Sequence, residues 1–121
     1  MPTFPSVFPW WWVSLTAIIA MAVSYGLLRW RFKKDFSVYE AILIAAIVGA
    51  SVLGWRWSAN VPQFNDDPVA GLSPNDWLSP VFTYVCLSLY AAFCRTASDA
   101  RWQQARALLT LVCFVVNVLV I

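Results

Sequence analysis

Four long apolar stretches, separated by short polar segments, dominate the sequence. Residues 10–28 contain no charged side chain, and residues 39–55 contain a single one, Glu40. Two further, mostly apolar stretches cover about residues 77–94 and 102–121. A helix needs about 20 apolar residues to cross the roughly 30 Å hydrocarbon core of a bilayer. The pattern therefore predicts four membrane-spanning helices, at about residues 9–30, 38–56, 77–94 and 102–121.

The positions of the cations predict how these helices are arranged. Lys and Arg favour the cytoplasmic side of short membrane loops. If the N-terminus lies outside the cytoplasm, seven of the eight cations fall on the cytoplasmic side: Arg29, Arg31, Lys33, Lys34, Arg95, Arg101 and Arg106. Only Arg56 then lies on the other side. We therefore predict an all-α membrane protein, an up-down bundle of four transmembrane helices in a single domain over residues 1–121, with both termini non-cytoplasmic.

The tryptophans support these boundaries. Indole rings concentrate in the headgroup zone of a bilayer. All eight tryptophans fall near a predicted helix end: Trp10, Trp11, Trp12, Trp30, Trp55, Trp57, Trp77 and Trp102. We therefore expect each of them to lie at a membrane interface, in a multi-pass protein of a bacterial inner membrane, a thylakoid or an equivalent membrane.

Capping patterns mark the starts of the second and third helices. Ser37 and Glu40 have the spacing of a capping box, in which Ser37 accepts from the backbone and Glu40 reaches back to the cap. Glu40 is also the one carboxylate close to a predicted span, so a proton or ion role is the alternative interpretation. Ser73 and Pro74 predict the start of the third helix, and Ser79–Pro80 offers a second possible start.

Small residues recur every four positions in the second apolar stretch. Such a stripe lets a neighbouring helix approach closely in a membrane, where lipid provides no hydrophobic drive for helix association. We therefore predict that the second helix is the central packing element, and that it packs through two stripes: Ala41, Ala45 and Gly49, and Ala46, Ala50 and Gly54.

Composition narrows the possible functions. Hydrophobic residues make up 61% of the chain, charged residues 12%, and the formal net charge is only +2, which does not indicate nucleic-acid binding. The chain contains no histidine, so it cannot ligate haem through His and lacks the commonest metal ligand. Cys86 and Cys94 would lie about 12 Å apart on one helix, too far for a disulfide. No nucleophile–base pair, glycine-rich phosphate loop or metal cluster is evident, so we predict no enzyme activity and no catalytic or metal-binding residue.

Asn117 is the one strongly polar side chain deep within an apolar stretch. Such an amide commonly forms a hydrogen bond across to another helix. A contact with a cofactor or pigment is the alternative, and Asn117 is therefore the candidate cofactor-binding residue.

The longest polar segments are the N-terminal arm and the predicted non-cytoplasmic loop at 57–76. The arm contains three prolines before residue 10, which is typical of an extended segment on the membrane surface. A loop as long as 57–76 in so small a protein is often functional. Its adjacent acids lack the spacing of a calcium-binding loop, so a docking surface or a simply solvated loop is favoured over a metal site. The candidate partner-docking residues are Phe4, Phe8, Phe64, Asp66 and Asp67.

Two functions are consistent with these features. The first is a non-catalytic accessory subunit of a larger integral-membrane complex, respiratory or photosynthetic, in which aromatic side chains (17% of the chain) pack against other subunits and against lipid, quinone or pigment held at a shared interface. The second is a homo-oligomeric transporter or channel for a neutral or hydrophobic solute. A transport path would have to use the few polar groups of the spans: Ser14, Thr16, Ser24, Ser51, Thr83, Ser88 and Asn117.

Overall fold

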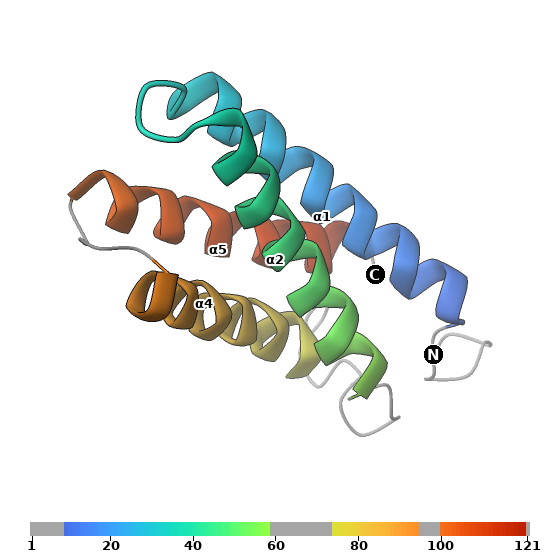
Figure 1. Ribbon diagram of the computed structural model, residues 1–121. Helices are drawn as coiled ribbons and strands as arrows, with labels where there is room; N and C mark the ends of the chain where they lie inside the picture. The colour runs from blue at the N-terminus through green and yellow to red at the C-terminus, as the bar shows by residue number, and fades with distance from the viewer. Residues whose placement is uncertain (1–8, 59–73, 95–99, 121) are drawn as a thin grey trace.

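The computed structural model describes residues 9–58, 74–94 and 100–120, which form four helices (Figure 1). These are α1 (Trp10–Arg31), α2 (Val38–Ser58), α4 (Pro74–Cys94) and α5 (Ala100–Val120). All four are long and apolar enough to cross a membrane, and no strand occurs in the described ranges. The prediction of an all-helical chain with four membrane-length helices is therefore confirmed.

The four helices close into a ring of contacts. The most extensive contact joins α1 to α2, and α2 packs against α4, which packs against α5. Helix α5 returns to α1 and closes the ring, while α2 and α5 touch little across it. In Figure 1, α5 passes behind α2 and between α1 and α4. This arrangement lets α5 contact residues from each of the other three helices.

A tight connection joins α1 to α2. Phe32 is the C-cap of α1, and its N–H donates to the carbonyl of Leu28 at 3.1 Å. The N–H groups of Asp35 and Phe36 then both donate to the carbonyl of Phe32, at 3.0 and 3.2 Å. Phe32 and Phe36 are buried. The hydrogen bonds of this turn therefore place two aromatic rings over the end of the core.

Helix α4 begins at Pro74 and continues through Pro80, so the alternative start at Ser79–Pro80 is not used. Proline lacks the N–H that would bond to the preceding turn, which normally weakens the interior of a helix. Membrane helices tolerate proline where their neighbours compensate for the freed backbone carbonyl. Pro80 is itself buried within the bundle.

The interior is apolar, and so is much of the outer surface. Ile44 and Val48 of α2, Leu87 of α4 and Leu109 of α5 are fully buried. Every helix also exposes large apolar side chains, among them Ile18, Ile42, Leu89 and Leu111. Water would not favour such a surface, whereas hydrocarbon chains or other membrane helices would cover it without cost.

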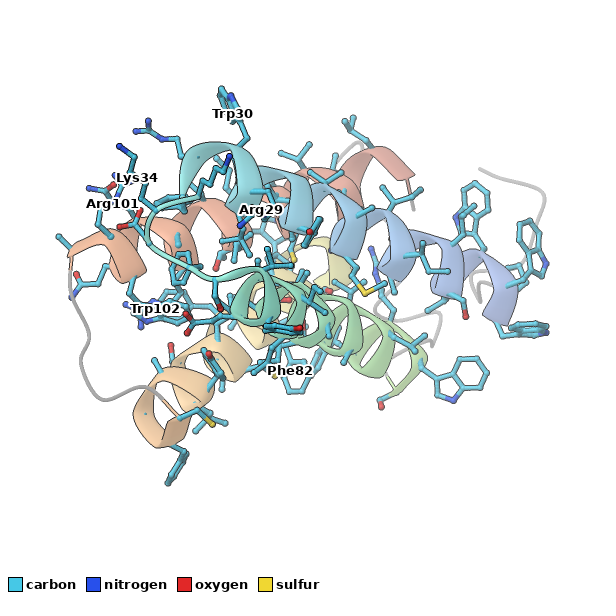
Figure 2. The ribbon with its side chains drawn as sticks, turned by 45° about the horizontal axis from the view of Figure 1, so that its top comes forward. Arg29, Trp30, Lys34, Phe82, Arg101 and Trp102 are labelled. Carbon is cyan, nitrogen blue, oxygen red and sulfur yellow. The ribbon has the colours of Figure 1, made fainter. Side chains whose placement is uncertain are left out.

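Trp102 packs inside the bundle, and its side chain is 0% exposed. Its ring lies edge-on to Phe36, with centroids 6.2 Å apart, and 5.8 Å from the ring of Tyr90. The first turn of α5 packs beneath the α1–α2 connection, which covers this indole. Trp30, by contrast, is 79% exposed and points away from the bundle (Figure 2).

Candidate functional site: buried polar contacts and an open groove

The most polar part of the interior joins α2 to α5. Arg56 is only 1% exposed, and its Nε donates to Oδ1 of Asn117 at 2.8 Å. Nδ2 of Asn117 donates in turn to the carbonyl of Cys113 at 2.6 Å. The predicted bond from Asn117 to another helix is therefore confirmed. Its partner, Arg56, is the cation at the end of α2, and no local sequence pattern identified it as the partner.

A pair of hydroxyls joins α2 to α4. Ser51 Oγ and Thr83 Oγ1 lie 2.7 Å apart, and both side chains are buried. Ser51 Oγ also lies 2.7 Å from the carbonyl oxygen of Val48, and Thr83 Oγ1 lies 3.2 Å from that of Ser79. Each hydroxyl has one proton, and the proton of one of them forms the bond that links α2 to α4.

Glu40 forms a second link between α2 and α4. The Ser37 hydroxyl accepts from the Glu40 N–H at 3.1 Å, which confirms Ser37 as the cap of α2. The Glu40 carboxylate accepts a hydrogen bond from the hydroxyl of Tyr90 at 2.8 Å. Because the Tyr90 ring also contacts Trp102, this carboxylate helps to position the buried aromatic cluster of Phe36, Tyr90 and Trp102.

Arg106 links α5 to α4. Its guanidinium carbon lies 4.5 Å from the ring centroid of Tyr84, a cation–π contact, and its Nη1 donates to the Ser88 hydroxyl at 3.2 Å. These contacts hold the half-buried Arg106 against the neighbouring helix.

The two predicted packing stripes lie on different faces of α2. Ala41, Ala45 and Gly49 are buried. A Cβ atom built at Gly49 would lie 3.1 Å from Cβ of Met21 and 3.4 Å from the carbonyl oxygen of Ala17. Glycine therefore permits α1 to approach α2 as closely as it does.

The second stripe, Ala46, Ala50 and Gly54, is exposed. Ala50 lines two adjoining hollows between α1 and α2, with volumes of about 260 and 470 Å³, and Gly54 lines the larger of the two. Ser14, Ala50 and Leu53 line both hollows, so the two form one continuous α1–α2 groove. Its walls are apolar apart from serine hydroxyls, so it fits an apolar helix face or an acyl chain.

Other predicted candidates are placed only in part. The partner-docking candidates Phe4, Phe8, Phe64, Asp66 and Asp67 lie outside the described residues. Within the described ranges, no three Cys, Asp or Glu side chains gather as they would around a metal ion. Cys86, Cys94 and Cys113 are free thiols.

Comparison with models of known protein families, with curated proteins and with solved structures found no match. Function is therefore inferred from the contacts and surfaces of the chain itself. Two features stand out among the described residues: a set of polar side chains used for contacts between helices, and an apolar groove that no other part of the described chain covers.

Proposed function

We propose that the protein is a non-catalytic accessory subunit of a larger integral-membrane complex, which its exposed helix faces help to assemble. The α1–α2 groove carries this proposal. Its small residues, Ala50 and Gly54, border a long apolar hollow at the outside of the bundle. Small residues at this spacing are the usual contact surface for a second membrane helix. The proposed partner is a helix of another subunit.

In this proposal, the bundle is up-down, with both termini on the non-cytoplasmic side, as the distribution of cations favours. The parent complex is bioenergetic, respiratory or photosynthetic. Lipid, quinone or pigment is held where the apolar surface meets a neighbouring subunit, because that surface is rich in exposed aromatic and aliphatic side chains.

The contacts of the polar side chains favour this function over a transporter. Thr16 donates to the carbonyl of Trp12, and Ser88 donates to that of Tyr84. Ser51 and Thr83 bind each other, and Asn117 binds Arg56. A transport path needs such groups to converge on one cavity, whereas these five bind neighbouring helices or their own backbone. Of the other two, Ser14 lines the α1–α2 groove, and Ser24 is buried without a hydrogen-bond partner among the described residues.

The decisive experiment is purification of the tagged protein from its native membrane in mild detergent, followed by native mass determination and an absorption spectrum. We expect a particle with several different subunits. A particle whose mass is a small multiple of the 13.6 kDa chain would contradict the proposal and favour a homo-oligomeric transporter.

The Ala50→Leu variant tests whether the groove mediates assembly. The added side chain would occupy the groove without entering the buried core, so we expect normal accumulation of the chain but loss of the other subunits. Ala107→Leu is the matched control, because Ala107 is also exposed but lies on α5, away from the groove. Equal retention of subunits by both variants would show that the groove is not the contact surface.

A further inference from the structure

One end of the bundle carries an open, strongly basic pocket that is separate from the α1–α2 groove. It has a volume of about 480 Å³ and lies where the end of α1 meets the start of α5. Four cations and a single carboxylate line it, together with one indole: Arg31, Lys33, Lys34, Arg101, Asp35 and Trp30. We call these six residues the basic pocket. Figure 2 shows Lys34 and Arg101 gathered at this end.

Arg101 is held in a fixed position within the pocket. Its Nε donates to Oδ2 of Asp35 at 3.0 Å, its Nη2 to the carbonyl of Arg31 at 3.2 Å, and its Nη1 to Gln104 at 3.1 Å. Its guanidinium also lies 4.7 Å from the ring centroid of Phe32. Of the five N–H groups of an arginine, two therefore have no partner among the described residues. A guanidinium fixed in this way presents a ready donor pair to a phosphate group.

The remaining cations of the pocket are not neutralised. Arg31, Lys33 and Lys34 are exposed, and none of them forms an ion pair within the described part of the chain. The one carboxylate, Asp35, is already bound to Arg101. Membrane topology needs cations at this end, but it does not require them to surround a common hollow. Their convergence favours an anion as the ligand.

The surroundings of the pocket favour a lipid as the source of that anion. Trp30 is 79% exposed, and indole rings prefer the headgroup zone of a bilayer. Gly26 and Val23 lie on the same face of α1 as Trp30, one and two turns further into the helix, and both are exposed. No atom would lie within 4 Å of a Cβ added at Gly26. An open apolar track thus leads from the pocket along α1 toward the middle of the bilayer, where an acyl chain would lie.

We propose that the basic pocket binds the phosphate headgroup of an anionic phospholipid, whose acyl chain follows the exposed face of α1. Arg101 donates its two available N–H groups to the phosphate, and Arg31, Lys33 and Lys34 supply the surrounding positive charge. Basic pockets between transmembrane helices are suited to anionic headgroups. This site does not depend on the accessory-subunit function and holds for the isolated chain.

The test is the binding of phosphatidylglycerol to the purified full-length protein, immobilised in a neutral detergent, with phosphatidylcholine as the uncharged comparison. We expect a clear preference for phosphatidylglycerol. Arg31→Gln and Lys34→Gln should each weaken that binding about fivefold, the effect of one cation near an anionic headgroup. Neither side chain has a described partner, so both variants should retain the wild-type circular dichroism spectrum.

Arg29→Gln is the matched control. Arg29 lies in the same last turn of α1 as Arg31 and carries the same charge, but it does not line the pocket. We expect its substitution to leave phosphatidylglycerol binding nearly unchanged. An equal loss in Arg29→Gln and Arg31→Gln would overturn the proposal, because diffuse surface charge would then explain the binding.

Two other outcomes would also overturn it. If excess inorganic phosphate binds alone and displaces phosphatidylglycerol, the ligand is a free phosphate anion and the apolar track is irrelevant. If the two lipids bind equally, while Arg31→Gln releases an acidic subunit from the native particle, the pocket is a protein contact.

Discussion

Asn117 forms hydrogen bonds with both polar atoms of its amide group. Its oxygen accepts from the Arg56 side chain, while its nitrogen donates to the backbone one turn earlier in α5. Burying a guanidinium is costly unless hydrogen-bond acceptors replace the water that it loses. The amide oxygen of Asn117 supplies one such acceptor to Arg56.

Asn117→Leu should destabilise the protein by about 2 kcal/mol, because it removes a hydrogen bond to a buried charge while preserving side-chain volume. The free energy of unfolding, measured in detergent micelles with a chemical denaturant, checks this value. Asn117→Asp is the control, since it keeps an acceptor at Oδ1 and should lose much less stability. An unchanged free energy of unfolding in Asn117→Leu would show that this bond contributes nothing.

Sequence reasoning found Asn117 but missed its partner, for a physical reason. An amide within an apolar stretch is conspicuous, because it must find a hydrogen bond. Arg56 follows a tryptophan at the end of a span, where an arginine normally reaches water. Its burial depends on a residue 61 positions away, so no local pattern could predict it. The burial of Trp102 likewise depends on distant residues, since Phe36 and Tyr90 lie on other elements.

Among the helices, the contact of α1 with α2 depends on Gly49, a residue without a side chain. Gly49 faces the backbone of Ala17 and the side chain of Met21. A helix surface without side-chain atoms at this point lets the two backbones come together, which gains many small dispersion contacts.

Gly49→Val should force α1 and α2 apart and lower stability by about 1–3 kcal/mol, the usual cost of overpacking. Gly54→Val is the matched control, because it introduces the same β-branched residue into the same helix at a position with open space around it. The difference in unfolding free energy between the two variants isolates the packing effect. Equal values would mean that the close approach at Gly49 is not important for stability.

The existence of the helices was predictable, whereas the faces through which they pack were not. Hydropathy and length were sufficient to place four helices, because a membrane span must be long and apolar. In a soluble helix, the polar face identifies the solvent side, but α2 is apolar on all sides. The two small-residue stripes therefore looked equivalent, although one is buried and the other is exposed, with Ala50 and Gly54 in the α1–α2 groove.

For the whole molecule, chemical labelling of the native Cys94 thiol tests the proposed topology. It is the exposed one of the three cysteines and ends α4. With Cys86 and Cys113 replaced by serine, a membrane-impermeant maleimide should label Cys94 only from the cytoplasmic side. Ser58→Cys, at the end of α2, is the comparison in a chain that also lacks Cys94, and should be labelled only from the opposite side. The reverse pattern would mean that the chain is inserted the other way round.

Helix α5 supplies a partner to each of the other helices. Arg101 binds the carbonyl of Arg31 at the end of α1, Arg106 binds Ser88 of α4, and Asn117 binds Arg56 of α2. During biosynthesis, α5 is the last of the four helices to leave the ribosome. A nascent chain that lacks it therefore lacks the bond from Arg56 to Asn117 and the contacts of Phe36 and Tyr90 with Trp102. Membrane proteases recognise such incomplete bundles, so translation arrested before α5 should yield a rapidly degraded fragment rather than a stable three-helix protein.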